Sequence, residues 1–169
     1  VLTAEHNEKY RLNSIYMSGW SQFKANNLVK ADQEFMKVLS ELIREQLIIK
    51  TSQERIVAKY QQFDNEELHA ASDDDFAKLS QSKQSLVGDT LRILTISLSQ
   101  QEQVQSLIAL FDSYQPLTEE NQHVVALEHV LFKALASFLI EKKLDHDAEL
   151  TYQAYIQRNP NNIWSTRFS

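Results

Sequence analysis

The sequence predicts an all-α protein, an antiparallel bundle of four to five helices, and three observations lead to this prediction. Only two glycines and two prolines occur in 169 residues, against an average usage of about 7% and about 5%. Tight turns and sheet corners depend on these two residues, so the chain can form few of them. Apolar residues recur at spacings of three and four, which is the period of a helix. Hydrophobic residues make up 43% of the chain, enough for a core, and we expect residues 1–169 to form a single domain.

The first helix is predicted over residues 3–23. Within it Tyr16, Trp20 and Phe23 lie at i, i+4 and i+7 and therefore share one stripe. Such a stripe is typical of a core-packing face rather than of a ligand platform. A break is expected at residues 25–27, Ala-Asn-Asn, because asparagine readily leaves helical geometry.

The second helix is predicted over residues 28–63, where the apolar periodicity continues. Its most favourable point of interruption is Thr51-Ser52, because Glu54 follows these residues as it would at a fresh helix start. Residues 64–75 are polar and acidic, and we expect them to form the main connection of the chain.

The third helix is predicted from residue 76 to about residue 114. Ser72 with Asp75 three residues later resembles a capping pair before it. At 1.5 Å rise per residue, a helix of about 40 residues would be about 60 Å long. Gly88 lies inside this helix, and a buried glycine where two helices cross closely is the ordinary explanation.

Two further helices are predicted in the last third of the chain. Pro116 ends the third helix, and Thr118, followed by two glutamates, begins a helix that continues to about Lys143. Asp145 opens a last helix to about Arg158, which the residues 159–162, Asn-Pro-Asn-Asn, close.

The last helix pair resembles a tetratricopeptide (TPR-like) repeat, in which two antiparallel helices pack through fixed large and small positions. Residues 129–162 follow that pattern in order and spacing, although three positions (136, 139 and 152) depart from its commonest residue. The resemblance implies a helical hairpin with a groove that binds a peptide or another protein. The matching residues are Phe132, Leu135, Ala136, Leu139, Ala148, Tyr152 and Pro160.

A fainter echo of the same pattern occurs near the start of the chain. Gly19, Ala31 and Phe35 hold the spacing of its small, small and aromatic positions. Nothing in residues 64–118 fits, and the two echoes are not separated by a multiple of the repeat period of about 34 residues. A regular array of repeats is therefore excluded.

In length and composition alone, the chain also resembles the extracytoplasmic sensor domains of bacterial chemoreceptors and histidine kinases. Those domains lie between two membrane spans and bind small ligands between long helices. A chain that begins at Val1, just before a long helix, is compatible with excision from such a receptor or with processing of a longer protein. The break at residues 159–162 departs from the resemblance, because the last helix of a sensor should run straight back into the membrane.

Composition excludes several classes of function. The net charge is −6 and the longest basic run is Lys142-Lys143, so nucleic acid is not the expected partner. The absence of cysteine excludes disulfides, zinc-thiolate sites and cysteine nucleophiles, and is compatible with both a reducing cytoplasm and a periplasm. Gly19 and Gly88 both lie inside predicted helices, which excludes a glycine-rich nucleotide loop. We therefore expect a protein that is not an enzyme and holds no cofactor. A membrane would be involved only through segments outside this chain, because no apolar run approaches the ~20 residues that span a bilayer.

Two Glu-x-x-His spacings are the sharpest chemical candidates, Glu66 with His69 and Glu120 with His123. Residues at i and i+3 share a helix face, and two such pairs with two more glutamates build the di-iron site of ferritin-like bundles. Both pairs, however, lie at predicted helix ends, and 23 acids and 5 histidines produce such spacings readily by chance. We therefore expect no metal site.

The other histidines give no stronger candidate. Glu128-His129 and His146-Asp147 are adjacent pairs, whose side chains point to different helix faces and cannot cooperate directly. We expect all five histidines, including His6, to be solvated or hydrogen-bonded at the surface.

The function expected from these observations is non-catalytic binding of a protein or peptide, and the alternative is a ligand-sensing domain of a membrane receptor. Two aromatic residues in the tail, Trp164 and Phe168, are expected to dock on the body of the domain or to contact a partner. The acidic residues Asp73, Asp74 and Asp75 are further candidate contacts with a partner. The sequence does not distinguish between oligomeric states.

Overall fold

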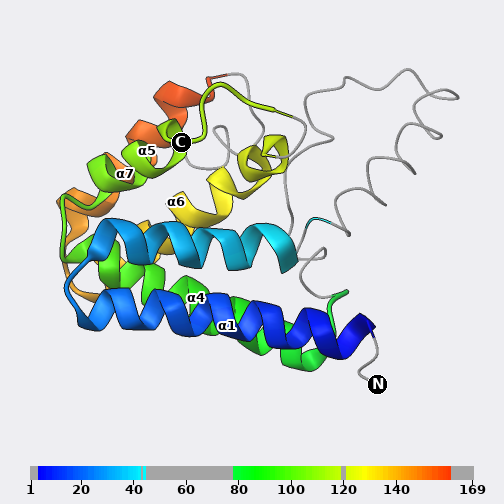
Figure 1. Cartoon of the computed structure of the whole chain (residues 1–169). Coiled ribbons are helices and arrows are strands. Elements are labelled where there is room, and N and C mark those ends of the chain that lie inside the picture. The colour runs from blue at the N-terminus through cyan, green and yellow to red at the C-terminus, as the bar shows by residue number, and fades with distance from the viewer. Residues whose placement is uncertain (1–3, 43, 45–77, 119–120, 161–169) are drawn as a thin grey trace, which may run out of the picture.

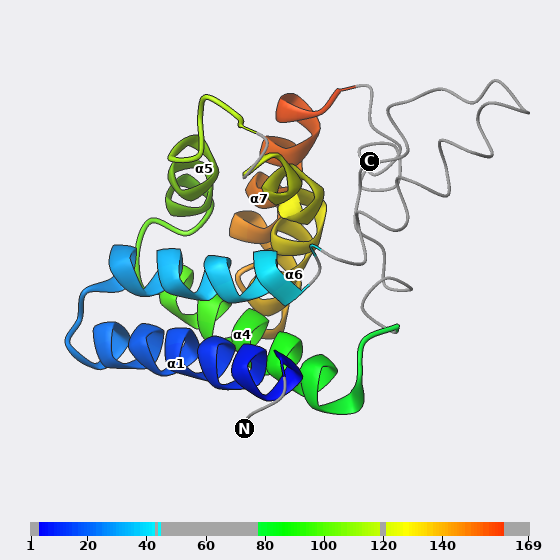
Figure 2. The same cartoon turned by 45° about the vertical axis from the view of Figure 1, so that its right-hand side comes forward.

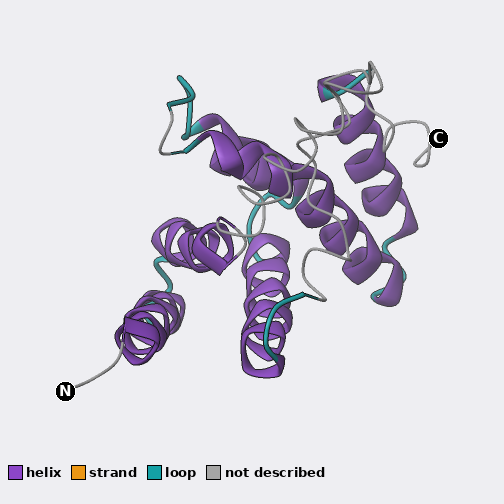
Figure 3. Ribbon diagram, turned by 90° about the vertical axis from the view of Figure 1, so that its right-hand side faces the viewer, coloured by secondary structure: helices purple, strands orange, loops and turns teal. Residues whose placement is uncertain are grey.

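The computed structural model describes residues 4–42, 44, 78–118 and 121–160, and every regular element among these residues is a helix (Figure 3). The predicted all-α class is thus confirmed. None of these helices is both long enough and apolar enough to span a membrane. In chain order the elements are α1 (Ala4–Lys24), a helix over residues 28–42, α4 (Gln81–Ser99), α5 (Val104–Asp112), the 3₁₀ helix η2 (Gln122–Leu127), α6 (Glu128–Glu141) and α7 (Asp145–Arg158).

The helices pack around α6, which contacts α4, α5 and α7 (Figures 1 and 2). The α1 helix lies beside the helix over residues 28–42 and runs in the opposite direction. An ion pair between Arg11 and Glu41 joins these two helices, and one between Lys83 and Glu8 joins α4 to α1. A single hydrophobic core connects both halves of the fold, and its largest fully buried side chains include Leu12, Phe35, Leu39, Leu94, Leu98, Leu107, Leu131, Phe132 and Tyr155.

The turn between α1 and the helix over residues 28–42 confirms the predicted break at Ala-Asn-Asn. Asn26 has a φ of 59°, in the left-handed region that asparagine adopts more readily than most residues. The amide of Asn27 donates to the carbonyl of Gln22 over 2.9 Å, which satisfies one of the last carbonyls of α1. The predicted stripe on α1 also packs inward, since the Tyr16 ring lies 6.0 Å from the ring of Phe35.

The close helix crossing that was expected at Gly88 occurs at the other glycine, Gly19. Gly88 is exposed on α4, and no atom lies within 4 Å of the position that a Cβ atom would take. The expectation of a buried helix crossing at Gly88 was therefore wrong. The close crossing occurs at Gly19, where a Cβ atom would lie 2.6 Å from Cε1 of Phe35.

The helix expected from residue 76 to about residue 114 is divided into α4 and α5. The polar run at residues 99–103 interrupts the apolar periodicity, and Gln103 takes a φ of 53°. This break lets α5 turn its own buried residues against α6 and α7. The start differs as well: residues 78–80 are not helical, and Ser80 caps α4 by accepting the amide N–H of Lys83 over 3.4 Å. The capping residue expected from the sequence, Ser72, lies outside the described residues.

The C-terminal half agrees more closely with the prediction. The last helix was expected from Asp145 to about Arg158, and α7 has these bounds. The single helix expected from Thr118 to about Lys143 differs in the structure: Thr118 is not helical, and the 3₁₀ helix η2 begins at Gln122 and is followed by α6, which ends at Glu141. Lys143, with a φ of 60°, forms the joint between α6 and α7. These two helices form a hairpin, and the side chains buried between and beneath them include Phe132, Leu135, Ala136, Leu139, Ala148 and Tyr155.

Candidate functional site

Most residues selected from the sequence as partner contacts or metal ligands lie outside the described residues. This holds for Trp164 and Phe168 in the tail, for the three aspartates at residues 73–75, for the pair Glu66 and His69, and for Glu120. His123 belongs to η2, but its side chain is not described. Among the residues that the structure does describe, no three His, Asp or Glu side chains are grouped so that they could hold a metal ion.

His129 corrects the expectation that every histidine is at the surface. His6 and His146 are exposed, whereas His129, in the first turn of α6, is buried together with Glu128. The reason is that several helices pack around the beginning of α6, so both neighbouring side chains are covered although they leave the helix in different directions.

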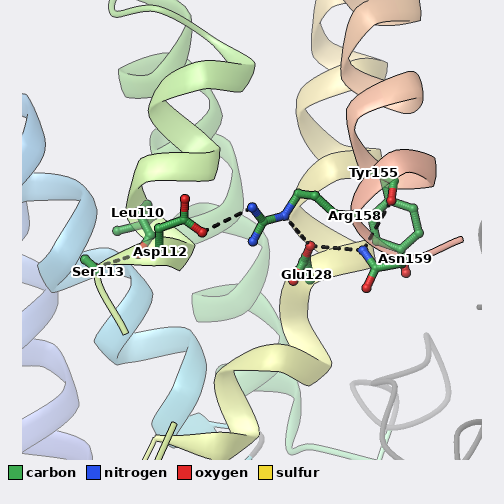
Figure 4. A network of polar contacts seen from close by, with 7 residues as sticks. All are labelled: Leu110, Asp112, Ser113, Glu128, Tyr155, Arg158 and Asn159. Atoms are coloured by element: carbon green, nitrogen blue, oxygen red, sulfur yellow. Dashed lines mark hydrogen bonds and ion pairs between the residues drawn. The ribbon is translucent and has the colours of Figure 1, made fainter. Parts of the chain in front are cut away.

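A polar network ties the end of α7 to the start of α6 and the end of α5 (Figure 4). Nε of Arg158 donates to Oε1 of Glu128 over 2.9 Å, and another guanidinium nitrogen donates to Asp112 over 3.1 Å. Asn159 donates to the same Glu128 oxygen over 3.0 Å. The Glu128 carboxylate also lies at the N-terminus of α6 and Arg158 in the last turn of α7, where the helix dipoles favour their charges.

One guanidinium, that of Arg158, is shared by the carboxylates of Glu128 and Asp112, and we interpret the network as a structural clamp. Burial alone would lower the pKa of Arg158, but the hydrogen bond and charge of Glu128, together with Asp112, raise it above its ordinary value. Burial, and then the charge of Glu128, raise the pKa of the buried Tyr155 hydroxyl. Neither group is thereby prepared to exchange a proton near neutral pH, and the network holds three helix ends in place.

Replacing Arg158 by glutamine is expected to lower the free energy of unfolding by about 1 kcal/mol. The change leaves the Glu128 carboxylate buried without its cation, although Asn159 still donates to it and the guanidinium was partly solvated. Urea denaturation measures the effect. Adding Glu128→Gln should recover part of the loss, so a double-mutant cycle in which the two effects simply add would contradict the clamp.

A groove of about 520 Å³ opens on the outer side of the α6–α7 hairpin. Its volume is in the range of about 300–1,000 Å³ that ligand sites occupy. On α7 two rows of side chains run along it, each with the helical spacing of four residues. One row is polar and acidic and the other is apolar, and one α6 side chain completes the apolar side. The rows are Asp145, Glu149 and Gln153, and Ala148, Tyr152 and Ile156, with Ile140 from α6.

The charge in this groove is one-sided. Asp145 and Glu149 are exposed carboxylates on its rim, and no Lys, Arg or His is among the lining residues. Gln153 donates to Glu149 over 3.1 Å, which orders that edge. Ile140, at 48% exposure, contributes exposed apolar surface to the groove. This groove was not predicted from the sequence, although the spacing of its two rows, at i, i+4 and i+8, can be read from the sequence.

A second, smaller pocket of about 130 Å³ lies between the helix over residues 28–42 and α5. Asp32 is only 3% exposed there, although it is a carboxylate. Its Oδ2 accepts a hydrogen bond from Gln101 over 2.6 Å, while Oδ1 has no hydrogen-bond partner among the described residues. Burial raises the pKa of Asp32 to about 6, against the opposing effects of Ser97 and Gln101. Asp32 was not predicted as a site residue either. Its position on the apolar helix face, between Leu28 and Phe35, could have indicated a buried carboxylate.

No protein-family model, no curated protein and no solved structure matches this chain. The two pockets and the clamp are thus the observations from which a function is inferred.

Proposed function

We propose that this chain is a non-catalytic module that binds an amphipathic peptide or a helix of a partner protein in the α6–α7 groove. The observation that supports this most strongly is the pair of parallel rows on α7, apolar and acidic, each covering two full helical turns. The matching partner segment has an apolar stripe flanked by Lys or Arg at the same spacing. The hairpin that forms the groove is the part of the chain that resembles a tetratricopeptide repeat, and such hairpins commonly present binding grooves.

The apolar row gives such a partner an area to cover. Tyr152 and Ile156 are half-buried, and the small side chain of Ala148 leaves depth between them and Ile140. Aromatic and aliphatic anchors in a partly desolvated pocket carry most of the binding energy in protein interfaces. The carboxylates at the rim would contribute mainly to the rate of association and to the choice of partner.

Selection of binders from a displayed library of 14-residue peptides tests this proposal. We expect the selected peptides to be enriched in Lys or Arg beside apolar residues spaced by three or four. Reversing both rim charges, Asp145→Lys with Glu149→Lys, should weaken their binding by about tenfold or more, and added salt should weaken binding to the unaltered protein. Fluorescence anisotropy measures both effects.

A matched control reverses an exposed charge away from the groove, Glu102→Lys in the connection between α4 and α5. This variant should bind the selected peptides as the unaltered protein does. If the library yields no binder, or if the groove variant and the control bind equally well, the proposed function is wrong.

The second candidate function is the sensing of a small ligand, as in the extracytoplasmic domains that the sequence resembles in composition. The observation that favours it is the Asp32 pocket, which lies between helices and holds a buried carboxylate with one unpaired oxygen among the described residues.

A further inference from the structure

The pocket at Asp32 is built from one face of each of two helices. Val29, Asp32 and Gln33 lie at i, i+3 and i+4 on the helix over residues 28–42. The facing side chains come from α5 at the same kind of spacing, and Gln101 closes the pocket from the α4–α5 connection. The contributions of α5 are Ser106, Ala109 and Leu110, and Ser113 follows directly after the helix.

The electrostatics of this pocket are unbalanced. Asp32 is the one ionisable side chain among the lining residues, and no Lys, Arg or His offsets its charge there. The groups that stabilise its charged form, Ser97 and Gln101, are both neutral, and a neutral donor stabilises a carboxylate less than a cation does. A buried carboxylate is ordinarily paired with a cation or a metal, and among the described residues no cationic side chain lines this pocket.

The size of the pocket limits what that partner can be. About 130 Å³ is slightly less than a cavity of about 150 Å³ that holds benzene, so a group of about five or six heavy atoms fits. The apolar part of its wall is formed by Val29, Ala109 and Leu110. Ser106 and Ser113 add hydroxyl groups. A Ca²⁺ site ordinarily brings several carboxylate and carbonyl oxygens together, whereas Asp32 is the one carboxylate that lines this pocket. An organic cation with a short aliphatic body suits the pocket better.

The geometry points to a binding site for a primary alkylammonium group in this pocket, with Asp32 as its counter-ion. The ammonium donates to the Asp32 carboxylate, and the alkyl chain lies against Val29, Ala109 and Leu110. The terminal torsion of an aspartate is broad and two-fold, so the carboxylate turns an oxygen toward the pocket when the cation enters. This inference stands independently of the α6–α7 groove, because no residue lines both pockets.

Thermal unfolding with n-butylammonium chloride at pH 8 tests the inference. We expect a saturable rise of the melting temperature by about 3–6 °C at ten times the dissociation constant. Equal concentrations of sodium chloride and of n-butanol, which supply the ionic strength and the alkyl chain separately, should produce no such rise. The same measurements with Asp145→Lys and Glu149→Lys should leave the response to butylammonium unchanged.

Two substitutions identify the pocket. Asp32→Asn removes the counter-ion, and Ala109→Leu fills the space without changing the charge; both should abolish the response. Asp89→Asn, which neutralises an exposed carboxylate on α4, is the matched control and should retain it. The inference is overturned if butylammonium has no effect up to about 100 mM, well above the dissociation constant expected for a specific ligand of this size. It is overturned equally if n-butanol acts as strongly, or if the Asp32→Asn variant still responds.

The ammonium group has two possible sources, a free small amine or a lysine side chain of a partner protein. Nα-acetyl-lysine N-methylamide distinguishes them, because it presents the lysine ammonium on its natural backbone. Binding as tight as that of butylammonium identifies a lysine, and binding of the free amine alone identifies a small amine. Both results support an alkylammonium site.

Discussion

Replacing Asp32 by asparagine is expected to raise the free energy of unfolding by about 3 kcal/mol at pH 8. The pKa of Asp32 is raised from 3.8 to about 6 by burial, so its charged form is disfavoured in the folded protein. A shift of about two pKa units corresponds to about 3 kcal/mol between the two protonation states. Asparagine keeps the shape of the side chain, and its amide oxygen can still accept the hydrogen bond from Gln101.

The sign of the pH dependence follows from the same shift. Between about pH 4 and pH 6 the folded protein binds a proton at Asp32 that the unfolded chain does not, so its stability falls as the pH rises through this window. The groups that hydrogen-bond or lie beside the carboxylate, Ser97 and Gln101, are neutral and do not titrate there. In the Asp32→Asn variant, the free energy of unfolding should fall less over this pH range, because the contribution of this one carboxylate is removed. Below about pH 4 the two proteins should be almost equally stable.

Urea denaturation at pH 4, 5, 6, 7 and 8 measures this difference. The exposed Asp89→Asn is the control, and surface substitutions of this kind change stability by no more than about 0.5 kcal/mol. A variant at Asp32 that is less stable than the unaltered protein at pH 8 would contradict the expectation. It would mean that the charged carboxylate is stabilised in the folded state after all.

Replacing Gly19 by alanine is expected to lower the free energy of unfolding by about 1–2 kcal/mol, whereas Gly88→Ala should raise it by about 0.5–1 kcal/mol. Alanine is the better helix former at both positions, by about 1 kcal/mol. At Gly19 the new methyl group would lie 2.6 Å from the ring of Phe35, which is fully buried and packed against Tyr16. Overpacking of a core by a methyl group costs about 1–3 kcal/mol, and exceeds the gain in helix propensity.

The two glycines form a matched pair, because the chemical change is the same and only the surroundings differ. At Gly88 the new methyl group meets no atom within 4 Å, so the gain in propensity is unopposed. Thermal or urea unfolding of the two single variants gives the comparison. Two shifts of the same sign would show that α1 and the helix over residues 28–42 are not as close as this structure places them.

The parts of the fold that could be predicted from the sequence depend on local signals. The all-helical class follows from periodicity and from the scarcity of glycine, and the joint at Asn26 from a residue that tolerates left-handed geometry. The bounds of α7 were predicted because an aspartate begins it and Asn159-Pro160 follows it. Each of these signals lies within a few residues of the feature that it predicts.

The errors concern features that depend on contacts between distant residues. Whether a helical glycine is buried depends on the helix opposite it, so Gly88 and Gly19 could not be assigned from their own neighbourhoods. The division between α4 and α5 has a local cause in the polar run at residues 99–103, but apolar residues on both sides suggested one continuous helix. The burial of His129 likewise follows from the central place of α6.

The candidate sites likewise combine features that are local in the sequence with features that depend on distant contacts. The rows on α7 and the carboxylate of Asp32 on an apolar face could both be read from spacing, but only the packing of α6 and α5 makes pockets of them. The contacts first expected, at residues 73–75 and in the tail with Trp164 and Phe168, lie outside the described residues and stay predictions.

The three joints at Asn26, Gln103 and Lys143 have a consequence for how this protein could be made more robust. All three turn the chain with a positive φ, and none is a glycine, although a side chain in that region costs about 1–2 kcal/mol. The joints lie between different pairs of helices and far from one another in the sequence. The change in stability on removing the backbone strain at one joint should therefore be independent of the other two. Removing the backbone strain at these joints, rather than changing the core, should therefore raise the free energy of unfolding without altering either pocket.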